Sequence, residues 1–242
     1  MFVIQSLPRC GTHLLRTALC SHGEITCFGE VFNPGSEIHG YPAKHPTVTE
    51  VLGHCLSQSR QTGFVAHAYV GLADHEIGPG LERAFRLRAD VNVAHGLWEA
   101  IPRDTPVVTL YRENLLERYV SQRIAERRQI WLVSKGQPVP LMERIRVDCN
   151  EMFKDFARVE ALMEIARARF PDALRTSYEQ LVDNADSTFG SILEFIGVPV
   201  TPLVPGTAKI GRPLGETIVN YREVRSSLCG TRFETFIHET TI

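Results

Sequence analysis

The stretch that decides the fold is FVIQSLPRCGTH, residues 2–13. Its first part, Phe2 to Leu7, is a short apolar run that ends at Pro8, and an apolar-periodic stretch from Leu14 to Leu19 begins a few residues later. This order predicts a strand, a tight loop and a helix. Such a loop points backbone N–H groups, and the positive end of the helix, at whatever lies above the carboxyl end of the strand. The stretch therefore predicts an anion-binding loop at the edge of a sheet.

The composition of this loop differs from that of ATP- and GTP-binding proteins. Those proteins carry G-x-x-x-x-G-K-[ST], whereas residues 8–13 contain one glycine and no lysine. Arg9 instead supplies a fixed charge and a two-pronged donor ahead of Gly11, and the Thr12 hydroxyl follows. The loop therefore argues against kinase chemistry, although a P-loop small-molecule kinase stays open as an alternative.

Outward from this loop, strand and helix patterns alternate along the chain. Candidate strands cover residues 63–70, 105–111 and 173–177, and candidate helices cover residues 114–131, 152–170 and 187–196. This alternation predicts an α/β protein with a three-layer, P-loop-like fold, in which helices flank a central parallel sheet. Residues 199–213 are rich in proline and glycine and predict a surface loop before a C-terminal helical tail. We expect a single domain over residues 1–242, because this length suffices for one core.

Charge and hydropathy limit the kinds of partner. The formal net charge is −2 and the pI about 6.5, so no global positive field attracts a nucleic acid polymer or an anionic membrane. No apolar run is long enough to span a bilayer, and residues 1–6 lack the pattern of a secretory signal. The six cysteines have no metal-ligand spacing, which predicts reduced thiols and no metal. We expect a soluble, cytoplasmic protein, and a homodimer is compatible with the sequence.

Five separated segments resemble the sulfotransferases that use 3'-phosphoadenosine 5'-phosphosulfate (PAPS). The first is the loop itself, because the 5'-phosphosulfate loop of that family commonly reads P-R-S-G-T-T. The second, SHG at 21–23 with GEVFNP at 29–34, is similar to a stretch of bacterial sulfotransferases that act on small molecules and carbohydrates. The others are YRENLLERYVS at 111–121, YEQL at 178–181, and RPL at 212–214 with NY at 220–221. The matches occur in the right order and cover most of the chain.

The resemblance implies one sulfotransferase domain and a set of donor contacts. PAPS, as co-substrate, would transfer its sulfuryl group to a hydroxyl, or an amine, of a small-molecule or carbohydrate acceptor, releasing adenosine 3',5'-bisphosphate without a metal. The residues implied in nucleotide binding are Arg9, Cys10, Gly11, Thr12 and His13 at the 5' side, Tyr178 at adenine, and Arg112, Ser121, Lys209 and Arg212 at the 3'-phosphate.

Two features depart from the family pattern. Cys10 and His13 stand where serine and a second hydroxyl residue are usual, so one donor contact would be lost or made by imidazole. Arg112 and Ser121 are nine residues apart, whereas the corresponding pair of the family is usually eight apart. These departures keep a third hypothesis open, a catalytically inactive nucleotide-binding relative.

Catalysis of sulfuryl transfer needs charge placement and a base. Like phosphoryl transfer, the reaction has a loose transition state, so Arg9 and the loop amides would stabilise the charge on the bridging oxygen. A carboxylate or imidazole must take the proton of the acceptor. The resemblance implies Glu30 as this base, with His67 and then His95 as rivals. The sequence does not identify the acceptor.

Overall fold

The computed structural model describes residues 1–32, 40–43, 46–70, 94, 96–131, 136, 144–207 and 212–237 of the chain. Its centre is a five-stranded parallel sheet with the strand order β2-β3-β1-β4-β5. The strands are β1 (Phe2–Ser6), β2 (Ile25–Glu30), β3 (Gln61–His67), β4 (Val107–Tyr111) and β5 (Leu174–Ser177). The predicted α/β class with a central parallel sheet is confirmed.

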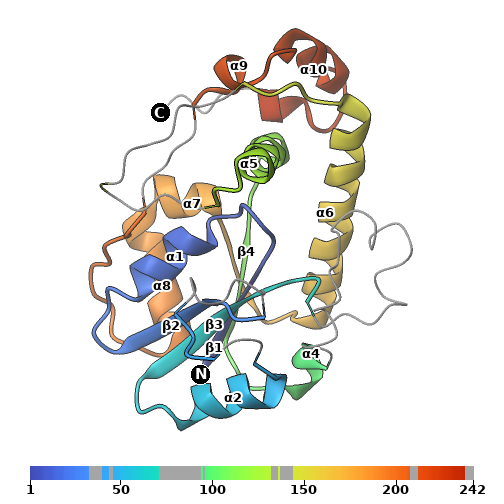
Figure 1. The fold of residues 1–242 in the computed structure, drawn as a ribbon. Coiled ribbons are helices and arrows are strands. Elements are labelled where there is room, and N and C mark those ends of the chain that lie inside the picture. Colours follow the sequence, from blue (N-terminus) through green and yellow to red (C-terminus); the bar gives the residue numbers. More distant parts are fainter. Residues whose placement is uncertain are drawn as a thin grey trace.

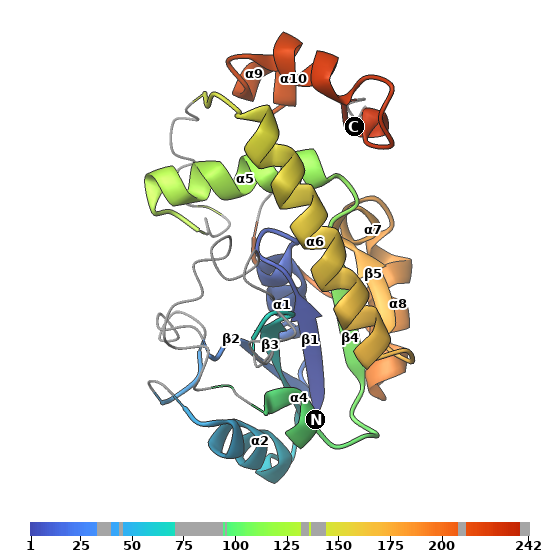
Figure 2. The same ribbon diagram turned by 90° about the vertical axis from the view of Figure 1, so that its right-hand side faces the viewer.

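Helices cover both faces of the sheet, as Figures 1 and 2 show. The helices are α1 (Thr12–Leu19), α2 (Val48–Ser57), α4 (Leu97–Ala100), α5 (Leu115–Arg128), α6 (Cys149–Arg169), α7 (Tyr178–Asp183), α8 (Ala185–Ile196), α9 (Leu214–Thr217), α10 (Tyr221–Leu228) and the 3₁₀ helix η3 (Glu234–Ile237). In Figure 1, α1, α7 and α8 lie on one side of the sheet and α6 on the other. Helix α5 crosses above the carboxyl ends of the central strands, and α9 and α10 lie beyond it. These strand ends and α5 frame the candidate site. Among the described residues, no helix is both long and apolar enough to cross a membrane.

The structure corrects several predicted boundaries, among them the start of strand β3 at Gln61 and of helix α8 at Ala185, each two residues earlier than predicted. Strand β3 ends at His67 and not at Val70, because the Val70 amide donates to the His67 carbonyl and turns the chain. Helix α5 ends at Arg128 and not at Trp131, since Gln129 has a φ of 56°, which a right-handed helix does not allow. Strand β4 begins at Val107, two residues later than predicted.

Strand β2 was not predicted from the sequence. Four of its six residues are buried, and three of these, Cys27, Phe28 and Gly29, follow one another. A strand covered on both faces lacks the polar-apolar alternation that identifies a half-exposed strand. The strand ends at Glu30, the residue that the resemblance implies as the base.

The pairing of β1 with β3 requires a residue without a side chain at position 63. Phe2 and Gly63 are opposite each other in the two strands, and Phe2 is completely buried. A Cβ atom placed on Gly63 would lie 2.5 Å from the Phe2 ring. Because the ring has no free space to move into, the first strand depends on this glycine.

We predict that Gly63→Ala lowers the free energy of unfolding by about 1–3 kcal/mol, the usual cost of overpacking a filled core. Gly53→Ala is the matched control, because Gly53 is exposed on α2 and a Cβ there meets nothing within 4 Å. The control should stabilise the helix by about 0.5–1 kcal/mol. Urea denaturation measures both. Equal effects of the two substitutions would contradict the packing role of Gly63.

Candidate functional site

The loop between β1 and α1 has an unusual backbone. Arg9 has a φ of 68° and Gly11 a φ of 91°, so the chain adopts the left-handed conformation twice within three residues. Gly11 is the N-cap of α1 and has no side chain with which to cap the first helical N–H groups. The helix therefore begins without a side-chain cap, with its positive end at the loop where the sequence predicts an anion.

An aromatic ring covers Gly11. A Cβ atom on Gly11 would lie 2.6 Å from Cδ2 of Tyr178, the first residue of α7. On the same ring lies the Arg112 guanidinium, 4.5 Å from the ring centroid, in a cation–π contact. Tyr178, which the resemblance assigns to adenine, and Arg112, which it assigns to the 3'-phosphate, thus contact each other beside the loop.

Arg112 also has acidic neighbours on α5 and α7. It forms an ion pair with Glu117, and its Nε lies 3.8 Å from Glu179. Its Nη1 donates a hydrogen bond of 3.4 Å to the Arg9 carbonyl. Glu179 in turn accepts hydrogen bonds from the amides of Glu113 and Asn114 at the start of α5. Arg112 is therefore held in place from several sides and braces the loop backbone.

A second buried arginine braces the same loop and was not predicted from the sequence. Arg118 is 1% exposed, forms an ion pair with Asp155 of α6, and donates a 3.4 Å hydrogen bond from Nη1 to the Pro8 carbonyl. Arg158, also on α6, lies 3.7 Å from the same carboxylate. The sequence does not predict that Arg118 is buried, because hydrophobic periodicity assigns a charged residue to the solvent face of α5.

The Arg9 side chain extends along α5. Its Nε donates a 2.9 Å hydrogen bond to the Ser121 hydroxyl, and its Nη1 donates to the Trp131 carbonyl. Burial, and then the nearby Arg112 guanidinium, lower the pKa of Arg9, while the Glu30 carboxylate raises it. Ser121 and Arg112, which the sequence assigned together to one phosphate, thus both contact Arg9, one at its side chain and the other at its carbonyl.

The remaining loop residues differ in their exposure. Cys10 is 1% exposed and its Sγ faces the Pro8 carbonyl at 4.0 Å, so its side chain lies inside the protein. Burial raises the pKa of this thiol, which stays protonated at neutral pH. Thr12 is buried, and His13 is partly exposed. The side chain of Cys10 therefore packs in the core, and this position offers a ligand only its backbone.

Two candidate bases form one pair. Glu30 ends β2, His67 ends β3, and Oε2 of Glu30 lies 3.1 Å from Nε2 of His67. The pairing of β2 with β3 shifts between Phe28 and Glu30, which are opposite the consecutive residues Phe64 and Val65. Such a bulge redirects the side chain that follows it. The rival assignments of the base thus converge on a single carboxylate–imidazole pair.

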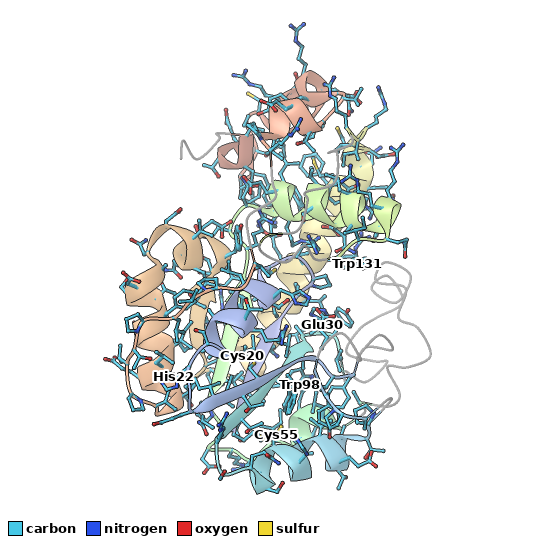
Figure 3. The ribbon with its side chains drawn as sticks, turned by 60° about the vertical axis from the view of Figure 1, so that its left-hand side comes forward. Cys20, His22, Glu30, Cys55, Trp98 and Trp131 are labelled. Carbon is cyan, nitrogen blue, oxygen red and sulfur yellow. The ribbon has the colours of Figure 1, made fainter. Side chains whose placement is uncertain are left out.

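This pair lies in an enclosed environment beside the loop. The Glu30 side chain is 18% exposed and that of His67 is 6% exposed, and the His67 ring packs 5.4 Å from the ring of Tyr69. Burial, and then the Glu30 carboxylate, raise the pKa of the Tyr69 hydroxyl. Glu30 faces Thr12 and His13 at the start of α1 across a gap that is too narrow to hold a water molecule. Figure 3 shows Glu30 on the same side of the molecule as Trp131, away from Cys20 and His22 near the other end of α1.

The late loop runs along α1 for part of its length. The amide of Gly206 donates to the Thr17 hydroxyl at 3.0 Å, and the amide of Val204 donates to the Ser21 hydroxyl at 2.9 Å. Arg212 is exposed. Lys209, assigned with Arg212 to the 3'-phosphate, and His95, a rival base, lie outside the described residues.

Comparison with known proteins finds a similarity in structure. No protein-family model matches the chain, and no curated protein matches it. The chain is similar to the crystal structure of a sulfotransferase from Alicyclobacillus acidocaldarius, with a TM-score of 0.50 and 14% sequence identity. The match covers 98% of this chain and 95% of that one. At this identity the likeness concerns the fold, which is the three-layer arrangement predicted from the sequence.

We predict that Arg118→Met costs about 3–5 kcal/mol of stability, because it leaves the Asp155 carboxylate buried without its main partner. Arg118→Met combined with Asp155→Leu should restore most of this loss, since neither charge then remains. Arg146→Met is the control: Arg146 pairs with Glu223 on the surface, with side chains 71% and 56% exposed, and its loss should cost about 0–1 kcal/mol. Urea denaturation compares the variants. A double variant no more stable than Arg118→Met would contradict the proposed coupling.

Proposed function

We propose that the protein is a PAPS-dependent sulfotransferase that sulfates a hydroxyl, or an amine, of a small molecule or carbohydrate. The observation that carries the proposal is the proximity of two features at the carboxyl edge of the sheet. One is an uncapped helix N-terminus beside Arg9, and the other is the Glu30–His67 pair at the ends of the two neighbouring strands. An anionic donor and a nucleophile that must lose a proton need these two features side by side. The fold shared with a sulfotransferase supports the same reaction class.

Arg9 and the start of α1 would hold the phosphosulfate. Arg9 and Arg112 lie close enough for one guanidinium to lower the pKa of the other, and a bound dianion would offset this repulsion. The negative charge that develops on the bridging oxygen, as its bond to sulfur breaks, would be stabilised by Arg9 and the helix amides. Thr12 is the first helical residue and its hydroxyl is a further candidate donor.

The proton of the acceptor would pass to Glu30. The acceptor oxygen forms a bond to sulfur, the bond from sulfur to the 5'-phosphate oxygen breaks, and adenosine 3',5'-bisphosphate leaves with that electron pair. Glu30 is the more exposed member of its pair, and its carboxylate lies 3.1 Å from Nε2 of His67, which can hold it in place. We therefore assign the base to Glu30 and its positioning to His67.

Tyr178 and Arg112 would contact the rest of the nucleotide. The Tyr178 ring lies beside the loop and offers an aromatic surface for adenine, with Arg112 against it. For Arg112 to bind the 3'-phosphate, the anion would have to compete with Glu117 and Glu179. Ser121, Lys209 and Arg212 complete the proposed group for this phosphate.

The alternatives make different demands on the site. A kinase would need a lysine in the loop and a metal with its nucleotide, and residues 8–13 contain no lysine. An inactive relative would bind adenosine 3',5'-bisphosphate and form no product. The proposed partners are PAPS and a small acceptor, in the cytoplasm, with neither a nucleic acid polymer nor a membrane involved.

We predict that the protein binds adenosine 3',5'-bisphosphate without magnesium and more tightly than it binds ATP, as measured by isothermal titration calorimetry. Arg9→Ala should weaken this binding by about ten- to a hundredfold, because it removes a charge-assisted donor. Arg222→Ala on the exposed face of α10 is the control and should leave binding unchanged. A requirement for magnesium, or equal affinity for ATP, would instead indicate the kinase.

We predict that Glu30→Gln keeps donor affinity and lowers turnover about a hundredfold or more, because the amide preserves size and removes basicity. His67→Asn should lower turnover less, since it disturbs the position of the carboxylate and leaves its charge. The measurement is mass spectrometry of cell extract incubated with heavy-sulfur PAPS, followed by kinetics on the labelled acceptor. Near-normal turnover by Glu30→Gln together with an inactive His67→Asn would transfer the role of base to His67.

A further inference from the structure

Two large apolar side chains are exposed at the end of α5. Ile130 and Trp131 follow the helix directly, and their exposed fractions are 43% and 42%. In the part of the chain that the structure describes, Trp131 is the one phenylalanine, tyrosine or tryptophan that is exposed. The position of this side chain in the molecule therefore needs an explanation.

The backbone of Trp131 is joined to the proposed donor site. Its carbonyl accepts a 2.5 Å hydrogen bond from Nη1 of Arg9, and Nε of the same guanidinium donates to the Ser121 hydroxyl. The Glu30 carboxylate is near enough to raise the pKa of Arg9, and Figure 3 shows Glu30 and Trp131 on the same side of the molecule. Trp131 thus lies beside the arginine that would hold the phosphosulfate, on the side that carries the proposed base.

The Trp131 ring differs from the other tryptophan of the chain, which has a structural role. Trp98 is 5% exposed, packs edge-on against the Phe170 ring and donates from Nε1 to the Val70 carbonyl. Among the described residues, the Trp131 ring has neither a ring partner nor a hydrogen-bond acceptor of this kind. Exposed tryptophan is typical of surfaces that bind a partner, because its ring offers a large apolar area at a low cost in conformational entropy.

The polar side chains next to this pair already have partners. Gln129 donates from Nε2 to the Glu126 carbonyl, and the Glu126 carboxylate pairs with Arg123. A ligand with many hydroxyl groups needs hydrogen-bond partners for those that it buries, whereas a flat apolar ring needs only contact area. The surface at the end of α5 therefore favours an apolar ring.

We propose that Trp131, together with Ile130, forms the surface on which the acceptor ring packs, so that the enzyme selects acceptors whose reacting hydroxyl is attached to an aromatic ring. This proposal rests on the sulfotransferase function above and specifies its acceptor. Trp131 acts here as a specificity-determining residue through its side chain. Its carbonyl, which binds Arg9, is present whatever the side chain.

The proposed base fits such an acceptor. A phenol hydroxyl, like that of tyrosine, has a pKa of about 10, and a carboxylate removes its proton more readily than that of a saturated alcohol, which is far less acidic. The phenol oxygen forms its bond to sulfur and its proton passes to Glu30. The bond from sulfur to the 5'-phosphate oxygen breaks, and the nucleotide leaves with that electron pair. The product is an aryl sulfate.

The test compares phenols with their saturated counterparts. Calorimetry of protein saturated with adenosine 3',5'-bisphosphate measures 4-methylphenol against 4-methylcyclohexanol, and 2-naphthol against decahydro-2-naphthol, with methyl glucoside as a carbohydrate. We expect at least one phenol to bind about two- to tenfold more tightly than its saturated counterpart, the usual gain from an aromatic pair. Trp131→Ala should abolish this preference, and Trp131→Phe should retain most of it.

Two controls separate the side chain from its surroundings. Leu56→Ala removes another exposed apolar side chain, 58% exposed on α2, which lies far from α5 in Figure 1, and should retain the whole preference. Trp131→Ala should also bind adenosine 3',5'-bisphosphate as the unmodified protein does, because the carbonyl that holds Arg9 remains.

Each outcome decides between the two proposals. If neither phenol is preferred, or if the preference survives in Trp131→Ala, the role of Trp131 is wrong. If Trp131→Ala weakens the nucleotide as much as the phenol, the residue supports Arg9 and does not select the acceptor. If methyl glucoside binds through Trp131 and the phenols do not, the aromatic assignment is wrong. If adenosine 3',5'-bisphosphate itself fails to bind, the sulfotransferase proposal fails, and the same pairs measured on the free protein still test Trp131.

Discussion

The site depends on how the backbone of the first loop is held. Arg118 of α5 donates to the Pro8 carbonyl, and Arg112, which precedes α5, donates to the Arg9 carbonyl. Two guanidinium groups therefore fix two consecutive peptide units of the loop. Arg9 adopts a left-handed conformation that costs energy for a residue with a side chain. These two contacts, with the Tyr178 ring on Gly11, stabilise a conformation that the loop sequence alone does not favour. The start of α1 without a side-chain cap follows from this arrangement.

The charges around the loop form a second constraint. Three arginines lie close to it, and Asp155, Glu117 and Glu179 compensate two of them. The third, Arg9, has its pKa lowered by burial and by Arg112. The charges of the two bracing arginines are thus paired, and Arg9 is the charge that the proposed anionic donor would meet. In the proposed function, the bracing residues would act through the loop, even where they do not touch a ligand.

The neighbouring strands bring the chemistry to this loop. The bulge before Glu30 directs its side chain to His67, and both residues end their strands at the same edge of the parallel sheet.

The sequence by itself determined the fold class and the place of the loop. The apolar run before Pro8 and the periodic stretch after it are local patterns, and local patterns report which backbone elements form. It also suggested Glu30 and His67 separately. Only the tertiary structure joined them, because their contact depends on the order of β2 and β3 and on a bulge that no local pattern reveals. The same holds for Arg118. A charged residue on a helix is expected at the surface, and its burial is decided by the elements that pack against it, which for Arg118 include Asp155 of a distant helix.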